Sequence, residues 1–194
     1  MKFKGIILAG GKGTRLNPLT KSVNKHLLPI YNKPLIFYPL SILMLANIKE
    51  ILIIVNKEDY DSYKKLLGNG SRMGIKITYK IQEKPNGIPE AFTIGKDFIQ
   101  NSNVALILGD NFFYSQGLTE TLIQSQKNFN GAKIFCYKVK NPNEFGIAEI
   151  KNKKIISLKE KPNYSKSNLA ISGLYFFDKH VSRLALNLKK SKRK

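Results

Sequence analysis

Short apolar runs alternate with longer segments of helical spacing over the first two thirds of the chain. Compact apolar runs predict strands at residues 6–9, 50–55, 103–108 and 132–139, and alternating apolar and polar residues predict another at 74–81. Between these runs, the spacing of apolar residues predicts helices at 34–46, 57–67, 88–98 and 118–129. From Gly146 the pattern changes to short strands at 147–150, 155–158 and 171–177, followed by a last helix at 180–188.

Strands that alternate with helices predict an α/β fold. We expect a Rossmann-like, doubly wound and mostly parallel sheet with helices on both faces and added short strands toward the C-terminus. Ligands of such sheets bind beyond the carboxyl ends of the strands. Three candidate motifs follow predicted strands in this way, namely the glycines at 10–13, Gln82 and Asp110.

The first of these motifs is a glycine-rich loop that runs through Gly10, Gly11, Lys12, Gly13, Thr14 and Arg15. Glycines let backbone N–H groups approach a ligand, and the nearby cations suit a polyphosphate. A P-loop is excluded because Thr14-Arg15, not Lys-Ser/Thr, follows the last glycine, and Leu16 is too large for a dinucleotide fingerprint. For a lone glycine cluster, a plain turn with surface lysines is the commoner interpretation.

The remaining candidates have ordinary alternatives. Asp110 directly after a buried strand suits a magnesium ligand, but an Asp-Asn pair equally suits a turn cap. Gln82 precedes a turn, and Glu160-Lys161-Pro162 is typical of a solvated hairpin end. His26 and His180 have no ligand partners at useful spacing, so we expect them to be structural.

Composition indicates one soluble domain in a chain of 194 residues. The net charge of +20 suggests nucleic acid, but the lysines are scattered among Asn and Ile, so nucleic-acid binding is a minority hypothesis. Residues 189–194 form a basic block, which is typical of a solvated tail. The single cysteine, Cys136, lies in an apolar run and is expected to be a core thiol. No apolar stretch is long enough to span a bilayer and no signal peptide is visible, so we expect a cytoplasmic protein without membrane contact.

Taken together, the motifs are similar to those of the sugar-1-phosphate nucleotidylyltransferases. The resemblance rests on the strings at 5–16, 25–31, 33–34 and 38–41, and continues at 67–71, 108–111, 160–162 and 173–176. These strings occur in order and extend to about Leu188, which makes the match far more specific than a single glycine motif.

This resemblance implies Mg²⁺-dependent transfer of a nucleotidyl group from dTTP to glucose 1-phosphate, releasing pyrophosphate. It implies nucleotide contacts at Gly10, Gly11, Gly13, Thr14, Arg15, Lys25, Gln82, Pro85 and Gly87. It implies a sugar-phosphate site at Asn111, Gly146, Glu160, Lys161 and Ile171. Arg15, Lys25 and Asp110 are the implied catalytic residues, with Asp110 as the metal ligand.

The sequence departs from the family pattern at three places. Phe145 stands where a tyrosine is common, and Ile88-Pro89-Glu90-Ala91 replaces the commoner Leu-Ala-Gln-Ala. In the family, an acidic segment with a second magnesium-binding aspartate follows the helix that matches 180–188, whereas residues 189–194 are basic here. We therefore expect a nucleotidyltransferase domain at 1–188 that is incomplete at its C-terminal end, with impaired activity. The alternatives are a non-catalytic nucleotide-binding remnant and uridylyl transfer from UTP; the family's homotetramer is a further expectation.

Overall fold

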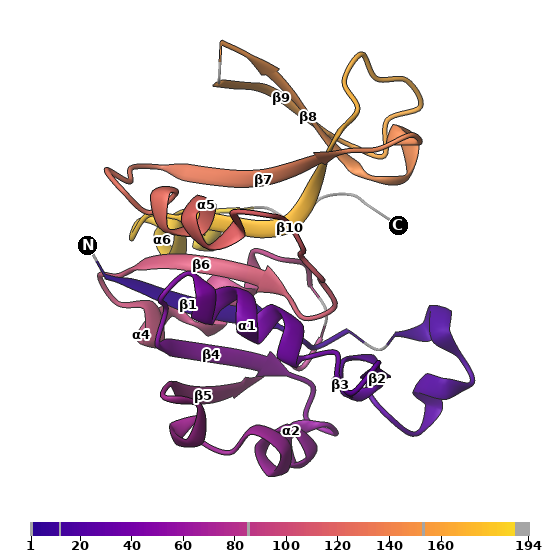
Figure 1. Ribbon diagram of the computed structural model, residues 1–194, viewed down its shortest axis with the longest axis vertical. Coiled ribbons are helices and arrows are strands. Elements are labelled where there is room, and N and C mark those ends of the chain that lie inside the picture. The colour runs from indigo at the N-terminus through magenta and orange to yellow at the C-terminus, as the bar shows by residue number, and fades with distance from the viewer. Residues whose placement is uncertain (1, 12, 85, 153, 189–194) are drawn as a thin grey trace.

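The computed structural model describes residues 2–11, 13–84, 86–152 and 154–188, and its main feature is one mixed sheet of eight strands (Figure 1). The strands are β1 (Phe3–Leu8), β4 (Glu50–Val55), β5 (Lys76–Ile81), β6 (Asn103–Leu108), β7 (Ala132–Lys138), β8 (Gly146–Lys151), β9 (Lys154–Glu160) and β10 (Leu169–Phe177). Their order is β5-β4-β1-β6-β10-β8-β9, and β7 also pairs with β10.

The sheet has a parallel half and an antiparallel half. In the parallel half β1 pairs with both β4 and β6, and β4 pairs with β5. In the antiparallel half β10 pairs with β6, β7 and β8, and β8 pairs with β9. The parallel Rossmann-like part and the short strands added after it are therefore confirmed, and the added strands are all antiparallel.

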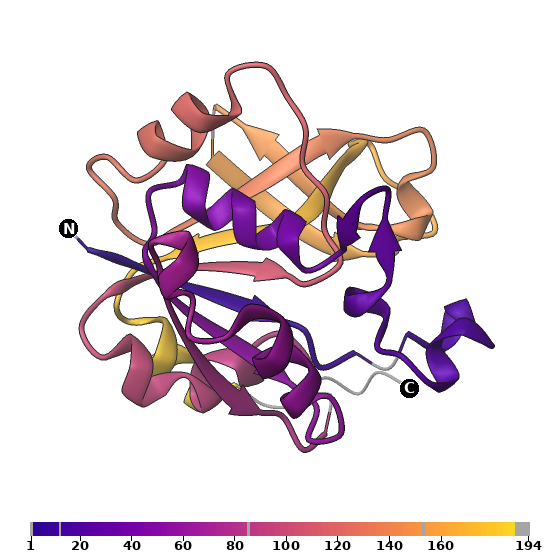
Figure 2. The ribbon, with the colours of Figure 1, turned by 60° about the horizontal axis from the view of Figure 1, so that its bottom comes forward.

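Helices cover both faces, as a doubly wound sheet requires (Figure 2). Side chains alternate along each strand, so Ile7 and Ile53 face one side while Ile6 and Leu52 face the other. The first face is covered by α1 (Phe37–Leu45), α2 (Tyr60–Leu67) and α5 (Leu118–Gln124). The second is covered by α3 (Glu90–Ile94), α4 (Lys96–Ile99) and α6 (Val181–Leu186).

Several sequence expectations need correction. The single helix expected at 88–98 is divided at Gly95, where a Cβ would lie 2.9 Å from the Ala91 carbonyl and 3.2 Å from both Ile6 and Leu52. Glycine there lets the chain pack closely on the sheet. Cys136 is only half-buried on β7, so it is not a core thiol. Lys12, Pro85 and the basic block at 189–194 lie outside the described residues.

The connection between β1 and α1 is built from short elements. Three 3₁₀ turns at Thr14–Leu16, Leu19–Lys21 and Lys25–Leu27 precede the small antiparallel pair β2 (Pro29–Ile30) and β3 (Lys33–Pro34). This segment extends beyond the carboxyl ends of β1 and β4 (Figure 1). It therefore lies over the edge of the sheet at which a ligand is expected.

Candidate functional site

The glycine loop leaves β1 at its carboxyl end and lies against two side chains from other parts of the chain. Gly10 is closely approached by the Gln82 amide oxygen, which occupies the space that a Cβ would need. At Gly13, where φ is +63°, a Cβ would lie 2.9 Å from the Lys25 Cβ. The Thr20 hydroxyl also donates to the Gly13 carbonyl at 2.9 Å. The positive φ and the close Lys25 Cβ favour glycine at position 13, whereas a Cβ at position 10 would displace the Gln82 amide.

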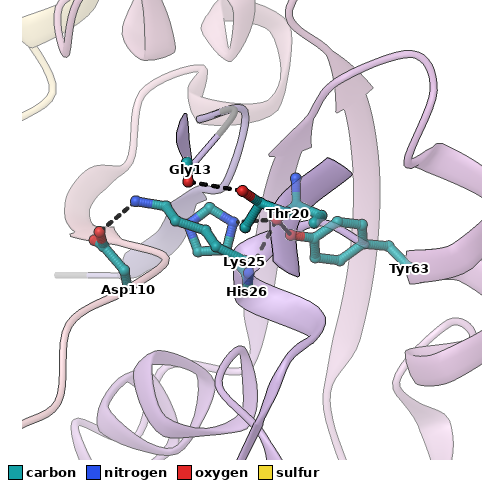
Figure 3. Close-up of polar contacts among 7 residues, drawn as sticks. Gly13, Thr20, Lys25, His26, Tyr63 and Asp110 are labelled. Atoms are coloured by element: carbon teal, nitrogen blue, oxygen red, sulfur yellow. Dashed lines mark hydrogen bonds and ion pairs between the residues drawn. The ribbon is translucent and has the colours of Figure 1, made fainter. Parts of the chain in front are cut away.

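Lys25 and Asp110 form an ion pair at this edge. The Lys25 Nζ lies 2.5 Å from the Asp110 Oδ2, and the two side chains are 21% and 39% exposed (Figure 3). Both residues line a cavity of about 380 Å³ together with Gly13, Thr14, Arg15, Leu16 and Leu35. The structure thus brings the three predicted catalytic residues, Arg15, Lys25 and Asp110, to one cavity beneath the loop.

A buried network behind Lys25 fixes its position. The Asn24 side-chain oxygen, Oδ1, accepts from the His26 backbone N–H at 3.0 Å and from the Tyr63 hydroxyl at 3.2 Å. The Asn24 amide nitrogen donates to Asp59 at 2.6 Å, which orients the amide. His26 Nδ1, 2.7 Å from the same Asn24 oxygen, must therefore donate to it. The network joins the turn at Lys25–Leu27 to α2 and the loop before it.

Burial and the neighbouring Lys25 charge lower the pKa of His26 to about 4, so its ring is neutral near pH 7. For Asp110 burial acts to raise the pKa, but the hydrogen bond and charge of Lys25 outweigh it, and the pKa lies below its ordinary value. Asp110 is thus an ionised carboxylate at neutral pH, as a metal ligand must be. The expectation that His26 is structural agrees with its 2% exposure and its place in the network.

The base-side candidates lie beyond β5 and β1. Gln82 follows β5 directly, its backbone N–H donates to the Val55 carbonyl at 2.8 Å, and its side chain contacts Gly10. Gly87 has a φ of +96° and lies in the exposed turn before α3. The structure therefore brings Gln82 to the glycine loop, and places Gly87 in the turn that leads to Glu90.

The sugar-side candidates gather on the antiparallel half. A Cβ on Gly146 would lie 2.9 Å from the Glu160 Oε2 and 3.5 Å from the Ile171 Cδ1, so these three residues are in mutual proximity. The Lys161 backbone N–H donates to the Phe145 carbonyl at 2.9 Å, which places Lys161 at the same hairpin end. Asn111 donates its side-chain amide to the Ser172 carbonyl beside Gly173, where φ is +77°.

Asp110 and Asn111, which follow β6, connect the predicted phosphate residues with the predicted sugar residues. Asp110 pairs with Lys25 below the glycine loop, whereas Asn111 bonds to β10. The irregularity in the β10–β7 register between Ile171 and Tyr175 contains Gly173, whose missing side chain makes room for Asn111. The turn after β6 therefore lies between the predicted phosphate and sugar residues.

Sequence reasoning missed the residues that support the site. Asn24, Asn56 and Asp59 form its polar framework, and Asn56 Nδ2 donates to Asp59 at 3.2 Å. The position of Asn56 directly after a buried strand was a usable signal, since polar residues at carboxyl ends often serve sites. Asn24 and Asp59 carry no such signal, because the bond that joins them spans 35 residues of the chain.

A larger hollow of about 850 Å³ lies elsewhere, around Lys2, Glu50, Lys127 and Phe129. It is at the amino end of β1 and contains none of the predicted site residues. We place the candidate site by its chemistry, at the smaller cavity with the ionised carboxylate and two cations.

Comparison with known proteins shows the family of the chain. The family described as nucleotidyl transferase matches residues 4–194. The chain belongs to this nucleotidyl transferase family. Within the family it is 53% identical over 192 residues to the glucose-1-phosphate thymidylyltransferase of Neisseria meningitidis, covering 98% of this chain and 67% of that protein. It is 48% identical to the Xanthomonas campestris enzyme of the same name, covering 98% of this chain and 65% of that protein. The chain thus spans about two thirds of the length of these family members.

Two solved structures have a similar fold. A Bacillus anthracis protein assigned as a glucose-1-phosphate thymidylyltransferase, in complex with sucrose, has a TM-score of 0.88 at 40% identity, covering 96% of this chain and 76% of that one. A UDP-glucose pyrophosphorylase in complex with UDP-glucose has a TM-score of 0.82 at 26% identity, covering 100% of this chain and 82% of that one. Over the described residues, no helix has the length and hydrophobicity needed to cross a membrane.

Proposed function

We propose that the chain transfers a thymidylyl group from dTTP to glucose 1-phosphate, giving dTDP-glucose and pyrophosphate. The observation that carries this proposal is the meeting of Arg15, Lys25 and Asp110 at one cavity below the glycine loop. Two cations and an ionised carboxylate suit a reaction whose substrates are both phosphates. The identity of 53% to a thymidylyltransferase supports dTTP and glucose 1-phosphate as the substrates.

The substrates are assigned to the two sides of the β6 turn. In the proposal, Gly10, Gly11, Gly13 and Thr14 hold the triphosphate with Arg15 and Lys25, while Gln82, Pro85 and Gly87 contact the base. Asn111, Gly146, Glu160, Lys161 and Ile171 hold the sugar phosphate. At Gly11, the Lys25 ammonium lies 3.8 Å from the position that a Cβ would occupy. The cation therefore lies beside backbone that no side chain covers.

Asp110 fits a magnesium site in this arrangement. Its carboxylate is ionised, partly exposed and at the cavity, and a magnesium ion bound to phosphates uses one or two protein carboxylates. Over the described residues, no group of three or more His, Cys, Asp or Glu side chains is placed to hold a metal. The ion would neutralise phosphate charge when bound, with water and substrate oxygens completing its ligands.

The reaction is a substitution at phosphorus. An oxygen of the sugar phosphate forms a bond to the α-phosphorus of dTTP as the bond from that phosphorus to the bridging oxygen breaks, and pyrophosphate leaves with the electron pair. Lys25 and Arg15 act by balancing charge on the phosphates, and the β6 turn orients the two substrates. When the nucleotide binds, the Lys25 ammonium is expected to exchange part of its bond with Asp110 for phosphate oxygens.

The test is pyrophosphate release from dTTP and glucose 1-phosphate with Mg²⁺, comparing wild type with Asp110→Asn. We expect the substitution to lower the rate at least ~100-fold, because one electrostatic group at a reacting phosphate contributes about that much. Asp97→Asn is the matched control, since the Asp97 side chain is 90% exposed and lies on α4. Equal rates in wild type and Asp110→Asn would contradict the assignment.

The same assay separates the other functions. Faster turnover of UTP than dTTP would favour a uridylyltransferase, and nucleotide binding without any product would favour a non-catalytic nucleotide-binding protein. Salt-sensitive binding to arbitrary DNA with indifference to nucleotide would favour nucleic acid as the partner. Light scattering on the purified chain tests the homo-oligomer that the family implies, and fractionation of cells tests a cytoplasmic location.

A further inference from the structure

The Gly13 carbonyl accepts hydrogen bonds from two groups that follow it in the chain. The Thr20 hydroxyl donates to it at 2.9 Å (Figure 3), and the Leu16 backbone N–H also donates to it at 2.9 Å. Thr20 is half-buried, and its Cγ2 lies 3.1 Å from the position that a Cβ on Gly13 would occupy. The Lys25 Cβ lies 2.9 Å from the same position, so Gly13 is enclosed between the two side chains.

The Thr20 hydroxyl has one hydrogen and two oxygens within reach. The Asn17 Oδ1 lies 3.0 Å from it, and the Gly13 carbonyl oxygen lies 2.9 Å from it. Asn17 is exposed, and a half-turn of its amide presents N–H hydrogens to the Thr20 oxygen in place of Oδ1. The hydroxyl hydrogen then goes to the Gly13 carbonyl. Asn17 therefore supports the bond from Thr20 to Gly13 rather than competing with it.

The direction of this carbonyl determines where the next backbone N–H points. A trans peptide is planar, so the Gly13 carbonyl and the Thr14 N–H point in opposite directions. Because the carbonyl is turned toward Thr20, the Thr14 N–H is turned away from it. Among the residues that the structure describes, the Thr14 N–H donates to no acceptor. It is therefore available to a ligand.

The backbone on the two sides of this peptide has the conformation of an anion-binding nest. Gly13 is left-handed, with a φ of 63° and a ψ of 28°, and Thr14 begins the right-handed 3₁₀ turn Thr14–Leu16. A change of hand between successive residues brings their N–H groups to one concave side, which attracts anions. Gly13, Thr14 and Arg15 line the same cavity as Lys25 and Asp110. The nest therefore suits a phosphate group in that cavity.

We propose that Thr20 is a positioning residue for the triphosphate, because its hydroxyl holds the peptide between Gly13 and Thr14 with the N–H directed to the ligand. This inference rests on the proposed function, in which the glycine loop binds the triphosphate of dTTP. Glycine at position 13 has many accessible backbone conformations, so without the hydroxyl this peptide can rotate. Thr20 does not line the cavity, and it acts on the ligand only through the loop.

The experiment is calorimetric titration of dTTP and Mg²⁺, without sugar phosphate, into wild type and three variants. Thr20→Val removes the hydroxyl but keeps a methyl against Gly13, and it should weaken dTTP binding about tenfold, the size of one well-placed hydrogen bond. Thr20→Ala, a second variant without the hydroxyl, should give the same loss. Thr20→Ser keeps the hydroxyl and should bind dTTP within about twofold of wild type.

Thr121→Val is the matched control. The Thr121 hydroxyl also donates to the carbonyl of a glycine with positive φ, since it lies 3.0 Å from the Gly117 oxygen and Gly117 has a φ of 69°. Thr121 lies on α5, outside the cavity, so we expect its substitution to leave dTTP affinity within about twofold of wild type. Melting temperatures measured without nucleotide establish that each variant is folded.

A second measurement separates positioning of the loop from a general loss of structure. In steady-state pyrophosphate release, Thr20→Val should raise the KM for dTTP about tenfold and leave the KM for glucose 1-phosphate within about twofold of wild type. A loosened fold would raise both values. Titration of inorganic triphosphate, which carries no base, should show the same weakening as dTTP, because the loop contacts only phosphate.

Three results would overturn this inference alone. If Thr20→Val binds dTTP as tightly as wild type, the hydroxyl does not position the loop. If Thr20→Ser loses as much affinity as Thr20→Val, the methyl contact with Gly13 is responsible instead. If both KM values rise equally in Thr20→Val, the effect belongs to the fold. These results leave the proposed function intact, whereas wild type that binds no dTTP overturns the proposed function and this inference with it.

Discussion

The nucleotide side and the sugar side of the candidate site are supported in different ways. On the nucleotide side, Lys25 follows Asn24, whose buried amide bonds to the His26 backbone and ring, Tyr63 and Asp59. On the sugar side, Glu160 and Lys161 are exposed at a hairpin end, and they are positioned by backbone pairing of β8 with β9.

The difference teaches where each kind of substitution should act. Polar side chains in a buried network contribute to both folding and chemistry, since removing one leaves others without partners. Exposed side chains on a paired hairpin contribute to ligand contact with little effect on folding. We therefore expect defects in rate and stability from the nucleotide side, and defects in sugar affinity from the sugar side.

The largest expected effect is on catalytic rate, from loss of the Lys25 charge. Lys25→Met should lower kcat at least ~100-fold, because in the proposed reaction the ammonium balances phosphate charge at the reacting centre. The matched substitution on the sugar side, Lys161→Met, should instead raise the KM for glucose 1-phosphate about tenfold, the size of one charge-assisted hydrogen bond. Steady-state pyrophosphate release with each substrate varied in turn measures both. If Lys161→Met mainly changed kcat, or Lys25→Met mainly changed the KM for glucose 1-phosphate, the expected difference between the nucleotide side and the sugar side would be contradicted.

The second prediction concerns the stability that the Asn24 network provides. Asn24→Ala should lower the free energy of unfolding by about 2–3 kcal/mol, because Tyr63, His26 and Asp59 each lose a buried partner. Asn101→Ala, at an exposed turn, is the control and should change it by less than about 0.5 kcal/mol. Urea denaturation measures both. A network with no role in folding would give equal values for the two variants.

The third prediction uses the pKa of His26, which is about 4 in the folded protein against an ordinary 6.5. Between these values the unfolded chain binds more protons than the folded one, so stability falls as the pH falls. The expected loss from pH 7.5 to pH 5 is about 2 kcal/mol. The lowered pKa of Asp110 acts in the same direction, but only at more acidic pH. Urea denaturation with EDTA in wild type and His26→Gln tests this, and an equally steep pH dependence in the variant would assign it to other groups.

Much of the fold follows from apolar spacing alone. The run at 50–55 and that at 103–108 coincide with β4 and β6, because strands buried on both faces are uninterrupted aliphatic segments. Apolar spacing did not predict the helix boundaries around Gly95, because the division between α3 and α4 depends on how closely the chain approaches Ile6 and Leu52. That approach is a tertiary property, which no local pattern contains.

The residues of the candidate site likewise fall into those that the sequence predicts and those that only the structure shows. Residues directly after strands, such as Gln82 and Asp110, could be found from sequence because the sheet edge determines where they lie. Glu90 differs, since its sequence signal was only a departure from the family pattern, and its contact with Gln82 became visible in three dimensions. Asn24 gave no signal, because its partners Tyr63 and Asp59 are 39 and 35 residues away.

The smallest expected effect concerns Gly146 on the sugar side. A Cβ there would lie 2.9 Å from the Glu160 Oε2, which is the far end of a flexible side chain and can move aside. Gly146→Ala should therefore leave the melting temperature nearly unchanged while raising the KM for glucose 1-phosphate about threefold, a modest loss for one displaced contact. Because the effect acts through Glu160, it should disappear in a Glu160→Ala background, which a double-mutant cycle of KM values measures. An undiminished effect in that background would mean that Gly146 contacts the sugar by itself, whereas a large fall in melting temperature would mean that this hairpin, like the Asn24 network, supports the fold as well as the ligand.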